Sequence, residues 1–354
     1  MKFRKTKLVN GLHHYVHEGI LADDYQRIHI VRFEQGVNPD LTLMPSKASA
    51  AVVPGTADRN VHRGDEATFQ QILEKQVAIR VMVNGVFHHF SKARYETTGY
   101  SSDFEKGDNV HRASYRGFQI GGPVTGEPRR YRYAHLTQIK PGYPFRLQTT
   151  SELSGTETLP FYTITCSPML IWEQQRCDLR EILHDDEELP ARSGSKRGVL
   201  PPGNLAHLHA PHPRTMIATT INSDLLFVTV DGPPKNFVGD SGPCDAKGLT
   251  WEGQVRLLEQ LRYVDESLEV RHAANMDGGG STTLYLHDGE RGEIRNRPSD
   301  PGRAIGNTLI IFDHSLLDRE TGVITEAHRE QILKGHAKHR AGFDEAWRLA
   351  KGDE

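Results

Sequence analysis

A run of three glycines, flanked by an acidic residue and hydroxyl side chains, is the part of this sequence best suited to chemistry. It reads Asn275-Met276-Asp277-Gly278-Gly279-Gly280-Ser281-Thr282-Thr283 and lies between two apolar segments. Glycine permits positive φ and close approach of a ligand, and successive backbone N–H groups in such a turn can bind an anion. The residues that would form this anion site are Gly278, Gly279, Gly280, Ser281 and Thr282.

Asp277 places a carboxylate at the same turn. A carboxylate beside an anion site is electrostatically costly unless it acts on a different atom of the substrate. A glycosyl phosphodiester has that geometry, because it carries a phosphate to hold and an anomeric carbon to attack or stabilise. From the residues alone, the other interpretation stays open: a tight turn whose aspartate caps the backbone.

Further polar residues stand at the ends of predicted strands. Arg214, with Thr215, precedes one strand and Arg303 precedes another. Arginine offers planar paired donors that suit a phosphate, although each arginine alone is more typical of a surface ion pair.

Two further strand ends carry an amide and a carboxylate. Asn84 and Gly85 end a strand, so Asn84 either binds a sugar hydroxyl or forms an Asn-Gly turn. Asp231 follows a strand directly and is either a turn residue or a second acid of the site.

Three histidines, His207, His209 and His212, have spacing that can chelate a transition metal. They lie in a Pro-rich stretch with no cysteine near, and the chain has 19 histidines, so clusters arise by chance. We therefore expect no metal and no cofactor, and keep a metal-dependent phosphoesterase as the weaker alternative.

The composition is that of a globular, water-soluble protein. The chain has 354 residues, 43 Lys+Arg and 46 Asp+Glu, which gives a formal charge of −3 and no case for general nucleic-acid binding. No apolar run reaches the roughly 18 residues of a membrane-spanning helix, and no signal peptide is visible, so a cytoplasmic location is expected. The three cysteines, Cys166, Cys177 and Cys244, lack the spacing of a disulfide framework or a zinc site. The oligomeric state is open.

Hydrophobic periodicity predicts an α/β (α+β) fold: one mixed β-sheet packed by helices, with strand-end loops forming a cleft. The single domain spans residues 1–314, with an irregular insertion or elaboration at 91–157, and a helical tail occupies 315–354. The predicted strands are 26–33, 78–83, 161–171, 215–221, 225–230, 271–276, 283–286 and 304–312. The predicted helices are 66–76, 250–263 with Thr250 as N-cap, and 325–351.

Taken in order, these segments resemble the phosphodiester glycosidase family over residues 15–312. The family's NGGFF is similar to Asn84-Gly85-Val86-Phe87-His88, its PRTAIG to Pro213-Arg214-Thr215-Met216-Ile217-Ala218, and its vvDGR to Thr229-Val230-Asp231-Gly232-Pro233. Its gP-x-L element is similar to Ser167-Pro168-Met169-Leu170, its LDGGGSST to Met276–Thr283, and its R-x-V-x-N to Arg303-Ala304-Ile305-Gly306-Asn307. The departures are Val86, His88, Ala218 and Pro233.

The resemblance implies a hydrolase that cleaves the bond between C1 of a sugar and a phosphodiester, with a small-molecule or glycan phosphodiester as substrate. Asp277 is the expected catalytic carboxylate and Asp231 a second carboxylate that activates water or holds an arginine. Arg214, Arg303 and the glycine amides are expected to bind phosphate, and Asn84 the sugar. A non-catalytic binder of a sugar phosphate, nucleotide or nucleotide sugar is the alternative from another functional class.

Overall fold

The structure is a computed structural model. It describes residues 1–21, 23–47, 67–75, 78–86, 118–120, 131–140, 142–154, 162–182, 208–233 and 246–316. The predicted helix 325–351, His207 and Cys244 lie outside these residues. Within them, no helix is long and apolar enough to cross a membrane.

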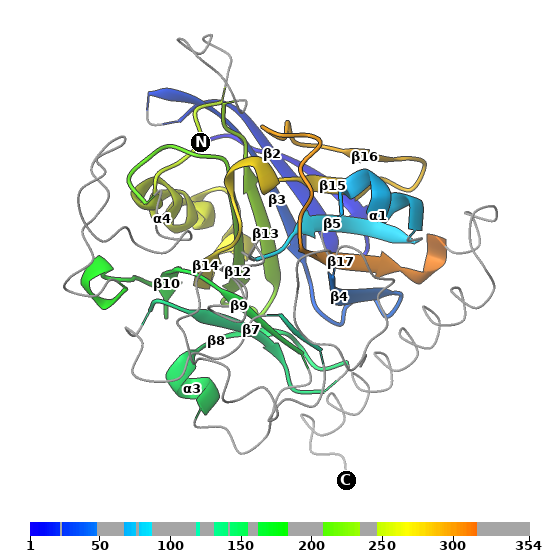
Figure 1. Ribbon diagram of the computed structural model, residues 1–354, viewed down its shortest axis with the longest axis horizontal. Coiled ribbons are helices and arrows are strands. Elements are labelled where there is room, and N and C mark those ends of the chain that lie inside the picture. The colour runs from blue at the N-terminus through cyan, green and yellow to red at the C-terminus, as the bar shows by residue number, and fades with distance from the viewer. Residues whose placement is uncertain are drawn as a thin grey trace, which may run out of the picture.

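Three β-sheets make up most of the described structure (Figure 1). The first has eight strands in the order β1-β2-β3-β13-β12-β14-β10-β11. Its strands are β1 (Arg4–Val9), β2 (Leu12–Leu21), β3 (Asp24–Phe33), β10 (Met169–Trp172), β11 (Gln175–Arg176), β12 (Arg214–Thr220), β13 (Leu225–Val230) and β14 (Val270–Asn275).

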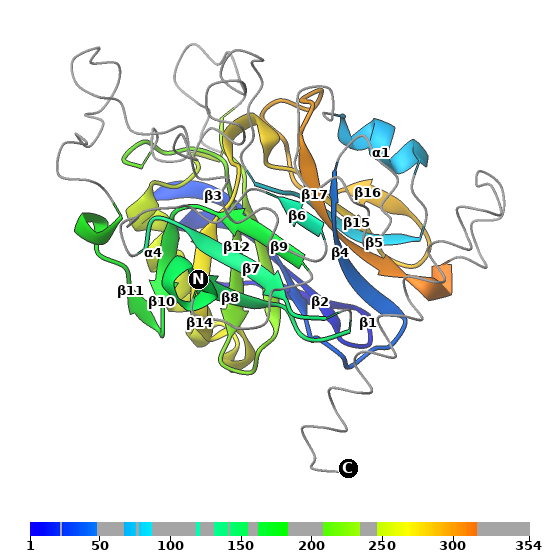
Figure 2. The same ribbon diagram turned by 60° about the horizontal axis from the view of Figure 1, so that its bottom comes forward.

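The second sheet has five strands in the order β16-β15-β5-β17-β4, and the third has four in the order β6-β9-β7-β8. The second consists of β4 (Leu41–Lys47), β5 (Ile79–Asn84), β15 (Leu284–His287), β16 (Gly292–Ile294) and β17 (Asn307–Asp313). The third consists of β6 (Phe118–Ile120), β7 (Ala134–Gln138), β8 (Arg146–Thr149) and β9 (Tyr162–Cys166). Figures 1 and 2 show these two smaller sheets on different sides of the central, eight-stranded one.

Helices are few among the described residues. They are α1 (Phe69–Lys75), α3 (Thr150–Ser154) and α4 (Trp251–Gln260), with short 3₁₀ turns such as η3 (Leu261–Tyr263), η4 (Glu266–Leu268), η5 (Gly279–Ser281), η2 (Leu179–Glu181) and η6 (His314–Leu316). As predicted, Thr250 caps α4: its side chain accepts a hydrogen bond from the Gly253 N–H. The buried face of α4, with Trp251, Val255 and Leu258, packs into the main core.

One hydrophobic core joins all three sheets. It contains Ile30 of β3, Val83 of β5, Ile164 of β9 and Val228 of β13, which are all completely buried. A smaller cluster packs α1 against the five-stranded sheet. A buried ion pair between Arg80 of β5 and Asp313 of β17 ties two strands of that sheet together.

The predicted fold class is only partly right. The described residues are mainly β-structure in three sheets, not one mixed sheet covered by helices. Among these residues, all pairs of neighbouring strands are antiparallel except β6–β9. The predicted strand 161–171 is two strands, β9 and β10, in different sheets. The break falls at Ser167-Pro168, where proline offers no N–H to a sheet. Strands β6, β7 and β8 lie in segment 91–157 and share a sheet with β9.

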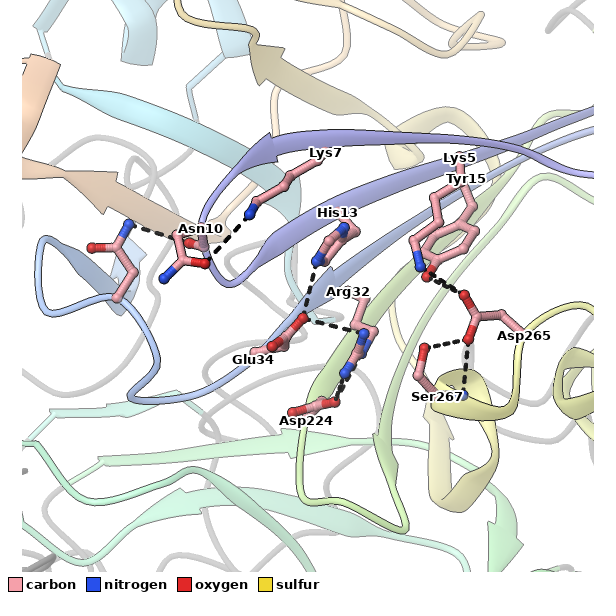
Figure 3. A network of polar contacts seen from close by, with 11 residues as sticks. Lys5, Lys7, Asn10, His13, Tyr15, Arg32, Glu34, Asp224, Asp265 and Ser267 are labelled. Carbon is pink, nitrogen blue, oxygen red and sulfur yellow. Dashed lines mark hydrogen bonds and ion pairs between the residues drawn. The ribbon is translucent and has the colours of Figure 1, made fainter.

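Asp265 fastens the N-terminal hairpin to the segment before η4 (Figure 3). Its carboxylate accepts hydrogen bonds from Lys5 Nζ at 2.8 Å and the Tyr15 hydroxyl at 2.9 Å, and from the Ser267 N–H and hydroxyl. Burial opposes ionisation of this carboxyl, but the bonds from Lys5, Ser267 and Tyr15 outweigh it and hold the pKa of Asp265 well below its ordinary range.

Asp265→Asn is therefore expected to lower the free energy of unfolding by about 1–2 kcal/mol near neutral pH. Because the folded-state pKa is depressed, the stabilisation is present above the unfolded pKa of about 4 and is lost as the pH falls below it. Urea unfolding of wild type and variant at about pH 7 and about pH 3 checks this. The gap between the two proteins should shrink in acid; an equal gap at both values would contradict the ionic origin.

Candidate active site

Strand ends from two sheets meet at one place in the molecule, and the predicted site residues stand at these ends. The predicted ones are Asn84 at the end of β5, Arg214 at the start of β12, Asp231 after β13 and Asp277 after β14. Thr283 before β15 and Asn307 at the start of β17, which were not predicted site residues, stand at the same place. The segments 87–117, 201–207 and 234–245, which adjoin these ends in sequence, lie outside the described residues.

Asn84 connects the glycine loop to two sheets. Its Nδ2 donates to the Asp277 carbonyl at 2.6 Å, and its Oδ1 accepts from the Thr283 N–H at 3.1 Å and from the Thr215 hydroxyl at 2.8 Å. The side chain has 0% of its surface exposed. The expectation that Asn84 binds the sugar is not supported by this geometry, because its amide is fully engaged within the protein. We propose instead that it positions the backbone of Asp277.

Asn307 explains why a glycine follows Asn84. The Asn307 Oδ1 accepts from the Val86 N–H at 2.7 Å, and its Nδ2 donates to the Val86 carbonyl at 3.0 Å. A Cβ on Gly85 would lie 1.8 Å from that Oδ1, so only glycine lets the amide approach. The carbonyl of Gly85 in turn accepts from the Asp277 N–H at 3.1 Å. Gly85 therefore allows the loop to pack closely, whereas its predicted role was substrate binding.

The three consecutive glycines are required for three different reasons. A Cβ on Gly278 would lie 2.7 Å from the Pro213 carbonyl oxygen, which also accepts a 2.9 Å hydrogen bond from the Gly279 N–H. Gly279 has φ +60° and open space around its Cβ position. A Cβ on Gly280 would lie 3.0 Å from Asp300 Cβ. A backbone contact, the backbone conformation and a side-chain contact each disfavour a larger residue at one of the three positions.

These contacts predict different outcomes for two matched alanine variants. Gly278→Ala must displace the loop from Pro213 and is expected to lower kcat/KM by about 10²-fold, because small misplacements of a catalytic group are costly. Gly279→Ala meets no atom and should lose only about 1 kcal/mol of stability from its positive φ. Steady-state kinetics and thermal unfolding of both variants check this. Equal losses of activity would show that loop position is not the cause.

Asp277 is partly exposed as a residue, but its carboxyl group lies in an environment that is unfavourable for its charge. The residue keeps part of its surface accessible, while the carboxyl group itself is closely surrounded. Burial raises the pKa of Asp277 to about 6, although the Ser281 hydroxyl, the positive charge of Arg303 and the Gly278 N–H act in the opposite direction. A carboxyl whose pKa is raised by burial, at the edge of a loop fixed by hydrogen bonds, is typical of a catalytic position.

Arg303 and Asp300 border the same loop. The Arg303 Cδ lies 3.6 Å from the Cβ position of Gly280, and the Arg303 N–H donates to the Asp300 carbonyl at 3.0 Å. Arg303 is close enough to Asp277 for its positive charge to act on the pKa of that carboxyl. Asp300 was not a predicted site residue. Its only sequence signal is its place three residues before Arg303.

Arg214 is turned into the protein. Its Nε donates to the Leu249 carbonyl at 2.7 Å and its Nη2 to the Ala210 carbonyl at 3.0 Å. Burial lowers the pKa of this guanidinium to about 10. These contacts do not support the expected phosphate-binding role of Arg214, because two of its donor groups hold loop carbonyls. Two of the three glycine N–H groups expected to bind phosphate are also engaged within the protein. The Gly279 N–H is bonded to the Pro213 carbonyl, and the Gly278 N–H faces the Asp277 carboxyl.

Asp231 is a buried anchor. Its Oδ1 accepts from Asn296 Nδ2 at 3.0 Å, and its Oδ2 accepts from the Arg297 N–H at 2.9 Å and Arg27 Nη1 at 3.4 Å. Burial raises the pKa of Asp231, against these hydrogen bonds and the charge of Arg27. With 1% of its surface exposed, Asp231 lacks the access that water activation requires, whereas its contact with Arg27 fits the other expected role, that of holding an arginine.

Asn296, which the sequence analysis missed, joins Asp231 to the glycine loop. Besides bonding Asp231, its Nδ2 donates to the Thr282 carbonyl at 3.0 Å, and its Oδ1 accepts from the Leu284 N–H at 2.7 Å. The sequence signal was weak, because Asn296 lies in a polar loop between β16 and β17. Its bonds to Thr282 and Leu284 fix the C-terminal end of the loop, where Asn84 also binds the Thr283 N–H.

Two hydroxyl residues of the loop are also buried. Thr282 is completely buried, with its Oγ1 3.3 Å from the Thr215 Oγ1, and Ser281 is 1% exposed and faces Asp277. Thr282 and Thr215 therefore lie within the loop support, while Ser281 lies at the carboxyl.

The histidines give no metal site in the described part of the chain, where no group of three His, Cys, Asp or Glu side chains could hold an ion. The backbone of His212 pairs with Leu249 through hydrogen bonds of 3.2 and 2.9 Å.

Comparison with known proteins identifies the family. The phosphodiester glycosidase family model matches residues 121–312, which is more than half of the chain. This range includes Ser167-Pro168, Arg214, Asp231, Asp277 and Asn307 but not Asn84, and it begins inside the segment 91–157. The chain therefore belongs to the phosphodiester glycosidase family.

Similar solved structures were also found, whereas no curated protein matches. The catalytic domain of zebrafish N-acetylglucosamine-1-phosphodiester alpha-N-acetylglucosaminidase, auto-inhibited by its pro-peptide, is 16% identical, with a TM-score of 0.46 over 88% of this chain and 89% of that one. A hypothetical protein from Synechocystis is 12% identical, with a TM-score of 0.42 over 88% and 64%. A putative exported protein from Burkholderia pseudomallei is 10% identical, with a TM-score of 0.36 over 83% and 75%.

Proposed function

We propose that this protein hydrolyses a glycosyl phosphodiester at the bond between C1 of the sugar and the phosphate oxygen, with Asp277 as the catalytic carboxylate. The observation that carries the proposal is the environment of Asp277: the residue keeps part of its surface accessible, burial raises the pKa of its carboxyl to about 6, and Arg303 lies near it. Its loop is fixed by Asn84, which bonds to both ends, and by Asn296, which bonds to the end at Thr282.

The reaction suits a site with one prominent carboxylate. The C1–O bond breaks, its electron pair leaves with the phosphate, and positive charge develops at C1, where the Asp277 carboxylate stabilises or captures it. Water then adds to C1 and loses a proton, so the products are the free sugar and a phosphate monoester. The phosphate is already a weak base, so it leaves with little help from a general acid. Arg303 and the Gly280 N–H are the donors that we assign to the phosphate.

Asp300 takes the place of Asp231 as the second carboxylate in this proposal. Asp300 contacts Gly280, which belongs to the same loop as Asp277. Asp231, in contrast, is buried and accepts hydrogen bonds on both carboxylate oxygens. We assign Asp300 the proton released by the attacking water, and Asp231 the positioning of Asn296.

The test is a mass-spectrometric analysis of products from purified protein incubated with a panel of sugar-1-phosphodiesters and nucleotide sugars. Release of free sugar together with an intact phosphate monoester is the expected result. Release of the sugar still bearing its phosphate would contradict the proposal and favour a phosphoesterase. If cleavage of that kind stopped on addition of a chelator, the metal-dependent alternative through His207, His209 and His212 would gain support.

One observation favours a non-catalytic binder of the same ligands as second candidate. Asp231, the second carboxylate expected from the family pattern, is engaged by Asn296, Arg297 and Arg27 and cannot serve chemistry without leaving them. Retention of an intact panel compound by both wild type and Asp277→Asn, with no product from either, would decide for the binder.

A further inference from the structure

A hollow of about 370 Å³ lies between the eight-stranded and four-stranded sheets, away from Asp277. Thr219 and Thr220 at the end of β12 line it, as do Arg271 and His272 at the start of β14. The glycine loop lies at the opposite ends of these same strands, which is about 20 Å away for a strand of this length. Figure 2 shows β8, which supplies another wall, beside β10 and β14. The volume is in the range of small-molecule sites, about 300–1,000 Å³.

The walls of this hollow combine an aromatic face with balanced charges. Its charged side chains are Arg146, Arg271, Glu152 and Glu173, two of each sign. Arg271 and Glu173 form a paired contact with both distances at 3.0 Å, and both remain about half exposed. Such a pair offers donors and acceptors together without a net charge. The hollow therefore suits an uncharged ligand rich in hydroxyl groups.

Trp172 supplies the aromatic face. Its ring lies on that of His272 with the centroids 4.0 Å apart, which fixes its orientation. The His272 Nδ1 accepts from the Glu173 N–H at 3.2 Å, and burial lowers the pKa of His272 to about 4, so the ring is neutral near physiological pH. A fixed aromatic face next to planar polar groups suits a sugar ring, which has apolar C–H faces and a polar edge.

A further observation marks the hollow as more than a gap in packing. Thr219 and His272 are register partners on neighbouring strands, and the buried Thr219 hydroxyl makes no hydrogen bond within the protein. Buried polar groups normally have a partner. Glu173 and Gln174 form the two-residue turn that joins β10 to β11, and their φ values of 46° and 62° are those of such a hairpin turn. This turn holds Glu173 against Arg271 and His272.

We propose that this hollow is a second binding site, for an uncharged saccharide. The sugar ring lies against Trp172, and its hydroxyl groups bond to Arg271 and Glu173. The site is separate from Asp277, and the proposal stands whether or not Asp277 is catalytic.

Saturation-transfer NMR tests the proposal, with the full chain and a panel of glucose, mannose, N-acetylglucosamine and their disaccharides as probes. Wild type should bind at least one probe saturably, with a dissociation constant of about 1 mM. Trp172→Ala should weaken this binding by about tenfold or more. Because Trp172 packs on His272, Glu173→Gln provides a second variant at an exposed position, with circular dichroism to confirm that both proteins fold.

Two control variants separate this site from others. Tyr263→Ala removes an exposed aromatic ring outside the hollow and should leave saccharide binding unchanged. Asp277→Asn tests the other end of the strands and should also leave it unchanged. Absence of saturable binding by the whole panel, equal binding by wild type and Trp172→Ala, or loss of binding in Asp277→Asn would each overturn the proposal.

Discussion

Asp277→Asn is expected to lower the turnover of a glycosyl phosphodiester by about 10³-fold or more while the protein stays folded. Asparagine keeps the size of the side chain but cannot carry the negative charge that stabilises or captures the developing cation at C1. Steady-state kinetics with a substrate identified from the panel measures the loss. Full activity in this variant would remove Asp277 from the mechanism.

The same substitution is expected to stabilise the protein near neutral pH. Because burial raises the pKa of Asp277 to about 6, the folded state favours its neutral form. The contribution of Asp277 to stability is therefore fully present below its unfolded pKa and is lost as the pH rises through about 6. Asp277→Asn removes this penalty, which is on the order of 2–3 kcal/mol above that pH.

Thermal unfolding at about pH 7.5 and about pH 4 checks the sign of this effect. The variant should exceed wild type in stability at the higher pH and approach it at the lower one. A variant that is less stable than wild type at about pH 7.5 would show that the carboxylate is well stabilised in the folded state. In wild type, kcat/KM should rise with pH through about 6, since the reaction needs the ionised carboxylate.

Asn84→Ala is expected to lower both stability and activity. Alanine leaves the Asp277 carbonyl, the Thr283 N–H and the Thr215 hydroxyl without their present partner at a fully buried position. Each buried polar group without a partner costs about 1–3 kcal/mol, so a loss of about 2–5 kcal/mol is expected. Because the Asp277 backbone is released, kcat should also fall by about 10²-fold or more.

Asn38→Ala is the matched control for this variant. Asn38 also bonds the backbone, but near the surface, through its Nδ2 to the Asn10 carbonyl at 3.2 Å and its Oδ1 to the Asp40 N–H at 3.0 Å. Its loss should cost less than about 1 kcal/mol and leave kcat unchanged. Urea unfolding and kinetics on both variants separate the two positions. An Asn84→Ala protein with normal kcat would mean that Asn84 supports the fold but not the position of Asp277.

The strands and the glycine loop were predictable because their signals are local. The hairpin of β12 and β13 and the cap at Thr250 follow from residues a few positions apart. The three-sheet arrangement was not predictable in this way. The apolar run 161–171 is continuous in sequence, and which sheet each half joins depends on partners more than 100 residues away, such as Ala274 for Met169.

The chemical roles of the site residues were likewise predictable only where the signal is local. Residue type indicated Asp277 and Arg303, but not whether a polar side chain faces a substrate or the protein. Asn84 and Arg214 are bonded inward, to Asp277 and to the Leu249 and Ala210 carbonyls. Asn296 carries no motif, and its role depends on Asp231, 65 positions earlier in the chain. Long-range hydrogen bonds of this kind have no signature in a single sequence.

Hydrolysis in water enriched in the heavy oxygen isotope tests the central claim most directly. If water attacks C1 of the sugar, the phosphate monoester keeps all its original oxygen atoms, and the label is in the free sugar. The phosphate is the product to measure by mass spectrometry, because its oxygens do not exchange with water, whereas the oxygen at C1 of a free sugar does. We predict an unlabelled phosphate monoester. A label in the phosphate would mean that water attacks phosphorus and that Asp277 does not act on the sugar.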